Sequence, residues 1–130
     1  MEKIGAYMSS PVLSTNPDAR AYDAAHDMFK HNVGALMVKD NGDYVGIFTK
    51  TDWMHKVLKW EGDPMAIKVS SVMTASIITV EKDEPLAKAS QLMEKNGIHH
   101  IAVMDKEKIV GILSIKDLER YYRKLYGIEL

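Results

Sequence analysis

The sequence predicts a mixed α/β (α+β) fold built from two copies of one β-α-β-β-α unit. The apolar stretch at 45–52 returns 65 positions later at 110–117, and in both places it runs into a Thr or Ser followed three residues on by an Asp. In each copy, short apolar runs alternate with segments of helical period. The same offset aligns identical residues without a gap, among them Lys3 and Lys68, Met28 and Met93, and Gly62 and Gly127.

The first half of each copy contains an expected strand and an expected helix. A weakly patterned segment at 4–9 or 69–74 precedes a short strand at 12–15 or 77–80. Asp18 and Asp83 are candidate N-caps, which places the first helices at roughly 19–31 and 84–96. Asn32 and the pair Asn96-Gly97 tolerate the left-handed conformation that ends a helix.

The second half of each copy contains two apolar strands and a second helix. The strands are expected at 35–38 and 45–48 in the first copy, and at 100–103 and 110–113 in the second. Asn41-Gly42 is a typical hairpin turn, and Lys106-Glu107-Lys108 fills the same place in the second copy. The second helices are expected to begin at Thr49 and Ser114, and a polar linker at 61–64 divides the chain into units 1–64 and 65–130.

Composition excludes several functional classes. Each half of the 130-residue chain is too small to be comfortable alone, so the two units are expected to form one module. The formal net charge of −1 gives no basic tract for nucleic acid, and the lack of Cys excludes disulfides and thiolate metal sites. No signal peptide or membrane-length apolar run is seen, so we expect a cytoplasmic protein with no membrane association.

Features of catalysis are not found in the sequence. No Gly-rich phosphate loop of the Walker type is present, and there is no Cys nucleophile. His26 and His31 are five residues apart, which does not match the i, i+4 spacing of a helical metal pair. We therefore expect no enzyme activity, no metal site and no resident cofactor.

The repeated Thr49-x-x-Asp52 and Ser114-x-x-Asp117 patterns have two interpretations. As capping boxes, they close the N-termini of two helices. As a ligand site, the helix N-terminus suits an anion and the carboxylate accepts hydrogen bonds from vicinal hydroxyls, which a phosphorylated ribose supplies together. Gly46 and Gly111 lie within strands, which indicates a bulge, a tight packing contact, or close approach of a ligand or another backbone.

The duplicated unit, ending each time in Gly-hydrophobic-x-Thr/Ser-x-x-Asp, resembles a tandem pair of CBS domains and leaves no segment for a separate effector domain, as in CBS-domain-only proteins. The resemblance implies two units packed sheet to sheet about a pseudo-twofold axis, with two clefts that bind AMP, ADP, ATP or S-adenosylmethionine as a regulatory ligand. It implies a signal-transduction module with a downstream protein partner. The alternative is a structural protein-interaction module whose clefts stay unoccupied.

The resemblance also assigns roles to residues. Asp52 and Asp117 would hold ribose hydroxyls, Thr49 and Ser114 would meet phosphate or ribose oxygen, and Ile47 and Ile112 would flank the sugar and base. Adenine in the Asp117 cleft would lie against Ala6, Pro11, Val12 and Val33, and the mirror cleft would use Ser71, Ser76, Ile77 and Ile98.

The two copies differ in charge and in aromatic content. His99 and His100 stand where the first copy has Gly34 and Ala35, and where the family often has Arg or His-Arg, so a titratable pair replaces a fixed charge. Adjacent residues of a strand point to opposite faces, so at most one of the two is expected to reach the cleft, and the other is packed or exposed. Lys116 is either a phosphate contact at the Asp117 cleft or a solvated surface residue. Aromatic residues on the last helices are either ordinary packing or a homodimer interface: Trp53, Trp60, Tyr121, Tyr122 and Tyr126.

Overall fold

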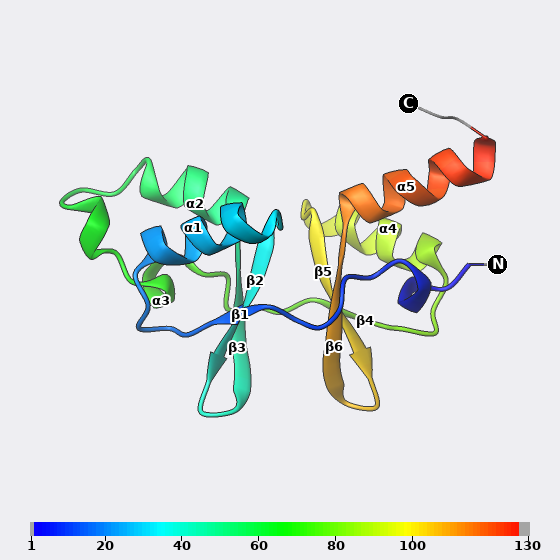
Figure 1. Cartoon of the computed structure of the whole chain (residues 1–130), viewed down its shortest axis with the longest axis horizontal. Coiled ribbons are helices and arrows are strands. Elements are labelled where there is room, and N and C mark those ends of the chain that lie inside the picture. Colours follow the sequence, from blue (N-terminus) through cyan, green and yellow to red (C-terminus); the bar gives the residue numbers. More distant parts are fainter. Residues whose placement is uncertain (1, 128–130) are drawn as a thin grey trace. The chain divides into compact units, whose positions relative to one another are not determined.

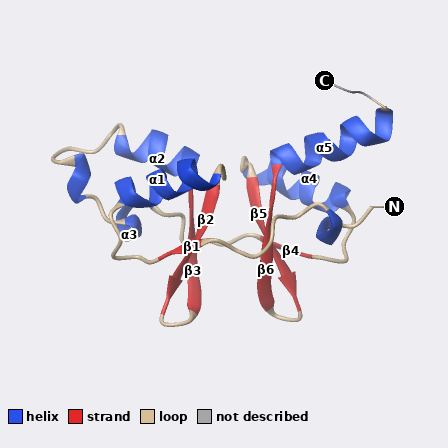
Figure 2. Ribbon diagram, viewed as in Figure 1, coloured by secondary structure: helices blue, strands red, loops and turns tan. Residues whose placement is uncertain are grey.

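The computed structural model describes residues 2–127 and confirms a mixed α+β fold with two three-stranded sheets (Figures 1 and 2). The termini of the expected 1–64 and 65–130 units, at residue 1 and residues 128–130, lie outside the described part. The elements of the first repeat are η1 (Ile4–Ala6), β1 (Ser14–Thr15), α1 (Ala21–His31), β2 (Ala35–Asp40), β3 (Asp43–Thr49) and α2 (Lys50–Val57). Those that follow are η2 (Pro64–Ala66), α3 (Val69–Val72), β4 (Thr79–Glu81), α4 (Leu86–Asn96), β5 (His100–Asp105), β6 (Lys108–Ser114) and α5 (Ile115–Tyr126).

The chain folds into two compact units whose limits differ from those of the sequence repeat. We call Leu13–Ile77 the Asp52 unit, and Met1–Val12 together with Ile78–Leu130 the Asp117 unit. The opening segment of each repeat thus packs with the remainder of the other repeat. We call these opening segments, residues 2–12 and 65–77, the exchanged segments. In the Asp117 unit, for example, the amides of Ile4 and Gly5 donate hydrogen bonds to the carbonyls of Glu84 and Lys82 at 3.0 and 2.8 Å.

The two sheets have the same topology and register. In the Asp52 unit, β1 pairs in parallel with β2, and β2 pairs in antiparallel with β3. In the Asp117 unit, β4, β5 and β6 repeat this arrangement. A register shift follows Val38 in β2 and Val103 in β5, whose partners are Gly46 and Gly111. The duplication therefore extends to the irregularities of the sheets.

The helix starts correct one prediction, because neither Asp18 nor Asp83 is an N-cap. Helix α1 follows Arg20 and α4 follows Pro85, and neither has a side-chain cap. Instead, the amide of Ala21 donates to the carbonyl of Ile67 at 2.8 Å, and that of Leu86 donates to the carbonyl of Glu2 at 3.4 Å. The exchanged segments thus satisfy the first helical amides with backbone carbonyls, which removes the need for a carboxylate cap.

Helix ends and hairpin turns agree with the sequence analysis. Asn32 and Gly97 cap α1 and α4 in the left-handed conformation, with φ of 54° and 61°. Both hairpin turns use positive φ at two successive positions, which are Asn41 and Gly42 in one, and Lys106 and Glu107 in the other. The second hairpin adopts this geometry without glycine.

Each unit has its own hydrophobic core beside its sheet. The core of the Asp52 unit consists of Ala21, Ala24, Met28, Leu36, Val38, Phe48, Ile67, Val69 and Val72. The core of the Asp117 unit consists of Ile4, Tyr7, Val80, Leu86, Ala89, Met93, Ile101, Val103, Leu113 and Leu118.

Within residues 2–127, no helix has the length and apolar character needed to span a membrane.

Candidate functional site

The capping interpretation of both Thr/Ser-x-x-Asp patterns describes real hydrogen bonds. Thr49 caps α2, because its hydroxyl accepts from the amide of Asp52 at 3.2 Å. In return, Oδ2 of Asp52 accepts from the amide and the hydroxyl of Thr49, at 3.0 and 3.2 Å. Ser114 and Asp117 make the same three contacts at the start of α5, at 3.3, 2.8 and 3.0 Å. Each carboxylate is thereby fixed in one orientation.

Both aspartates are buried, although carboxylates seldom are. Asp52 is 5% exposed and Asp117 is 6% exposed. Since Oδ2 of each residue is used by the capping box, Oδ1 is the atom that remains for other partners. The chemistry of each candidate site therefore depends on what surrounds Oδ1.

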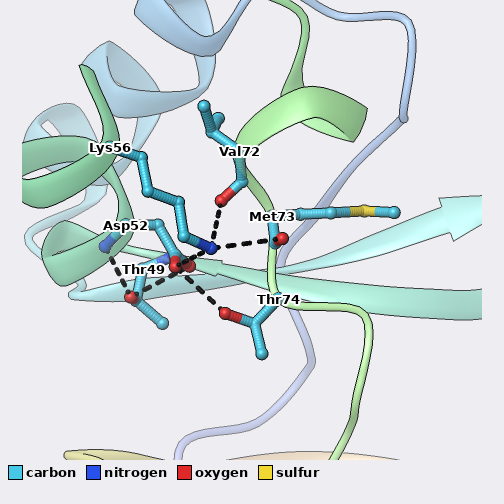
Figure 3. A network of polar contacts seen from close by, with 6 residues as sticks. All are labelled: Thr49, Asp52, Lys56, Val72, Met73 and Thr74. Atoms are coloured by element: carbon cyan, nitrogen blue, oxygen red, sulfur yellow. Dashed lines mark hydrogen bonds and ion pairs between the residues drawn. The ribbon is translucent and has the colours of Figure 1, made fainter. Parts of the chain in front are cut away.

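In the Asp52 unit, Oδ1 has two donors (Figure 3). The hydroxyl of Thr74 donates to it at 3.0 Å, and the ammonium of Lys56 forms an ion pair with it at 3.0 Å. Lys56 also donates to the carbonyl oxygens of Val72 and Met73, at 2.9 and 3.4 Å. Through Lys56 and Thr74, Asp52 is tied to the exchanged segment that follows α3.

In the Asp117 unit, Oδ1 accepts from the guanidinium of Arg120 at 3.2 Å. The same guanidinium donates to the carbonyl oxygen of Tyr7 at 3.1 Å and lies 5.4 Å from the centre of the Tyr7 ring. Asp117 is thus also linked to an exchanged segment through a cation one turn further along its helix, but that cation is an Arg instead of a Lys. The hydroxyl of Tyr7 is buried without a hydrogen-bond partner among the described residues.

Gly46 and Gly111 are explained by close approach of another backbone. A β-carbon at Gly46 would lie 2.8 Å from Sδ of Met73 and 2.9 Å from the carbonyl oxygen of Thr74. At Gly111 the corresponding atoms are Sδ of Met8 at 2.6 Å and the carbonyl oxygen of Ser9 at 2.9 Å. The glycines therefore admit the exchanged segments to the strands that lead into the capping boxes.

The exchanged segments also form backbone bridges beside the glycines. Ile47 exchanges two hydrogen bonds with Thr74, both at 2.9 Å, and Ile112 exchanges two with Ser9, at 2.9 and 3.1 Å. Ile47 and Ile112 are each 9% exposed. The predicted site residues Ile47, Thr49 and Asp52 therefore form one group, and Ile112, Ser114 and Asp117 form another.

The other predicted residues of the Asp117 site belong to the same unit, with one exception. His100 pairs with Ser114 across β5 and β6, and the carbonyl of His99 accepts from the first amide of α5 at 2.9 Å. Lys116 is exposed at the second position of α5. Ala6 and Pro11 are exposed and Val12 is half-buried, whereas Val33 belongs to the Asp52 unit and its assignment to this site stays a prediction.

The predicted residues of the Asp52 site follow the same scheme. Ser71 lies in α3, and both Ser71 and Ser76 are exposed, while Ile77 is half-buried. Ile98 belongs to the Asp117 unit, where it packs against the core, so its assignment also stays a prediction. The first amide of α2 donates to the carbonyl of Gly34 at 3.0 Å, as the first amide of α5 donates to His99. The first amide of each helix is therefore already hydrogen-bonded to a carbonyl and is not available to bind an anion.

Three residues that contact the carboxylates were not predicted from the sequence. Lys56 and Arg120 lie four and three positions after their aspartates, a helical spacing at which opposite charges meet, so this signal was available. Thr74 is 22 positions from Asp52, and only the fold brings them together.

Outside the candidate sites, Lys82 forms an ion pair with Asp105, 3.1 Å away. The hydrogen bond to Asp105 and the charge of that carboxylate raise the pKa of Lys82.

Known proteins share both the sequence repeat and the fold. The family model of the CBS domain matches residues 4–59 and again 69–124. The CBS domain-containing protein CBSX3, mitochondrial, of Arabidopsis thaliana is 36% identical over 125 residues, which are 92% of this chain. The chain spans 61% of the length of that relative.

Two solved structures illustrate the match in fold. An uncharacterised conserved protein from Pyrococcus horikoshii has a TM-score of 0.85 and 34% identity, covering 93% of this chain and 92% of its own. The CBS domain pair of protein MJ0100, in complex with 5′-methylthioadenosine and S-adenosyl-L-methionine, has a TM-score of 0.85 and 25% identity, covering 95% and 98%. The chain therefore belongs to the CBS-domain family and carries two CBS domains in tandem.

Proposed function

We propose that this chain is a regulatory module that binds an adenosine-containing ligand, either AMP, ADP or ATP, or S-adenosylmethionine. The single observation that supports this most strongly is a buried carboxylate held at the start of a helix in each unit, with Oδ2 fixed by a capping box. The related MJ0100 pair, crystallised with S-adenosyl-L-methionine and 5′-methylthioadenosine, supports the adenosyl class of ligand. The proposed role is sensing and not catalysis.

The chemistry of the proposed site follows from the orientation of the carboxylate. A ribose presents two neighbouring hydroxyl donors, and Oδ1 of an aspartate can accept from them once the bound cation moves aside. Arg120 and Lys56 can do so at low cost, because their side chains are 55% and 44% exposed and each keeps a carbonyl partner. At the Asp117 site, one of His99 and His100, together with Lys116, is proposed to meet a phosphate or another polar group of the ligand.

The amide variant Asp117→Asn tests the proposed site. It keeps the shape of the side chain but removes the negative charge, so affinity for the adenosyl ligand should fall by about 1.5–3 kcal/mol, or roughly 10- to 150-fold. Calorimetric titration with AMP, ADP, ATP and S-adenosylmethionine measures this change. Glu119→Gln, an acid-to-amide change at an exposed position of the same helix, is the matched control and should leave affinity unaltered.

A structural interaction module with unoccupied sites is the alternative function. It is favoured by the internal partners that both carboxylates already have. A thermal-shift panel of the same ligands with 5′-methylthioadenosine separates the two functions, because a ligand that binds the native state raises the unfolding midpoint. A midpoint that stays constant at millimolar concentrations of every compound would support the interaction module.

We also propose that two copies of the chain associate through their helices, in the cytoplasm, and signal to a downstream protein. Support comes from apolar side chains exposed on α1 and α2, since Phe29 is 80% exposed and Met54 is 58% exposed. Phe29 borders a groove of about 220 Å³, whose lining is Ala25, Met28, Phe29, Asn32, Lys50 and Trp53. A closed twofold dimer would cover Phe29 and this groove on both copies at once.

The variant Phe29→Asp is expected to convert the dimer into a monomer, because it replaces the exposed aromatic ring that borders this groove with a charge. Light scattering on a sizing column should give twice the 14.6 kDa chain mass for the wild type and a single chain mass for the variant. Lys106→Asp, in the turn between β5 and β6, is the control and should remain dimeric. A wild-type mass of one chain would contradict the proposed dimer.

A further inference from the structure

The two carboxylates differ in how far their internal partners saturate them. Asp52 has four contacts, two on each oxygen, from Thr49, Thr74 and Lys56. Asp117 has three among the described residues, because its Oδ1 has Arg120 alone. A carboxylate has about four acceptor positions, so Asp52 is saturated and Asp117 retains one position on Oδ1.

The difference comes from single residues at equivalent places of the repeat. Thr74 corresponds to Ser9, and both make the same backbone bridge, to Ile47 and to Ile112 respectively. The hydroxyl of Thr74 donates to the carboxylate, whereas no such bond joins Ser9 and Asp117 in the described part of the chain. A threonine hydroxyl has restricted side-chain rotamers that can hold it in this position, while a serine turns more readily toward solvent.

Thr74 occupies a position that a ligand hydroxyl would need. A ribose hydroxyl at Oδ1 of Asp52 must displace the Thr74 hydroxyl, which gives up a hydrogen bond in a partly buried place. At Asp117 only Arg120 has to move, and its guanidinium keeps the carbonyl and the ring of Tyr7 as partners. Ribose binding therefore costs more at Asp52 than at Asp117.

We propose that the Asp117 site is the primary adenosyl site and that Thr74 keeps the Asp52 site closed, so that each chain binds one ligand tightly. Thr74 is then the residue that determines how many sites are used. This inference rests on the proposed adenosyl-binding function, and it adds which carboxylate serves as the acceptor. The hydroxyl at position 74 acts as an internal substitute for the ligand.

Calorimetric stoichiometry with 5′-methylthioadenosine, S-adenosylmethionine, AMP and ATP tests the inference on the full chain. For the ligand that binds, the wild type should show one tight equivalent per chain. Asp117→Asn should lower the affinity of that tight site at least tenfold, because a tenfold change corresponds to roughly one lost hydrogen bond. Asp52→Asn should leave the affinity of the tight site within about twofold of the wild type. Two equal wild-type equivalents, or a larger loss from Asp52→Asn, would overturn it.

A reciprocal pair of variants tests the role of Thr74 directly. Thr74→Val keeps the shape of the side chain but removes the hydroxyl, and it should add a second equivalent whose affinity is about tenfold above that of any weak wild-type site. Ser9→Thr introduces the threonine at the other site and should weaken the tight equivalent. Ser9→Ala is the matched control and should leave both sites as in the wild type.

The outcomes distinguish this inference from the proposed function. If ligand binds at one tight equivalent and Thr74→Val adds a second, both stand. If ligand binds but Thr74→Val leaves the stoichiometry unchanged, the role of Thr74 is overturned while the adenosyl function remains. If no compound binds to the wild type or to Thr74→Val, the adenosyl function fails and the inference fails with it.

Discussion

Replacing Phe48 with alanine is expected to lower the free energy of unfolding by about 3–5 kcal/mol. Phe48 is 0% exposed and belongs to the core of the Asp52 unit, on the strand that ends at Thr49. Removing the ring leaves a cavity among side chains contributed by α1, β2 and the exchanged segment, which cannot all shift to fill it. Because the cavity lies one residue before the capping box, the Asp52 site should loosen as well.

Urea unfolding followed by circular dichroism measures this loss as a lower midpoint at constant slope. The control is Leu125→Ala on α5, which removes an apolar side chain from a position that is 56% exposed and lies outside the proposed dimer interface. It should change the stability of the isolated chain by less than about 1 kcal/mol, as surface substitutions usually do. Equal effects of the two substitutions would show that the core assignment of Phe48 is incorrect.

The double variant Gly46→Ala/Gly111→Ala is expected to destabilise the chain by roughly 2–6 kcal/mol, since each overpacked site costs about 1–3 kcal/mol and the two sites belong to different units with different neighbours. Each new β-carbon would meet a backbone carbonyl oxygen at 2.9 Å, and a bridged backbone cannot yield as a side-chain tip can. The exchanged segments would have to separate from β3 and β6. Ligand affinity should fall with stability, because those strands lead into the capping boxes.

Thermal unfolding of the two single variants and the double variant tests this expectation. Ser70→Ala serves as the control, since it places an alanine at an exposed position of the segment that follows η2. It should cost less than about 1 kcal/mol, within the range of a tolerated surface change. A double variant as stable as Ser70→Ala would mean that the glycines have another role.

The repeat made much of the fold predictable. A constant offset, together with strand and helix periods, was sufficient for the order of elements in both copies, for the hairpins, and for the ends of α1 and α4. The starts of these helices were placed too early, because a side-chain cap was expected at Asp18 and Asp83. Their first amides are satisfied by Ile67 and Glu2, which are distant in sequence, and local patterns do not contain that information.

The candidate site was predictable to the extent that its contacts are local. The capping boxes are contacts over three residues, and the Lys56 and Arg120 ion pairs follow helical spacing. The contact of Thr74 with Asp52 depends on the exchange of segments and could not be read from either repeat alone. The two interpretations of the strand glycines could be separated only when their neighbours were known.

The aromatic residues of the second helices show the same limit. Trp53 packs against the core and contacts the ring of Tyr22, and Tyr121 packs against Tyr7, so both contribute to packing. Helical spacing cannot separate the inner and outer sides of a helix that carries aromatic residues on both. Phe29, which is more exposed than either, was not singled out because it lies on the first helix.

The exchange of opening segments has a consequence for how such a chain could have arisen. A peptide holding a single repeat would lack the segment that completes its own core, since that segment is supplied by the other repeat. Two identical ancestral peptides could complete each other by trading their leading ends, and a later gene fusion would make that trade permanent. In a joined chain the two halves need not stay identical, and Ser9 and Thr74 are equivalent positions at which they differ.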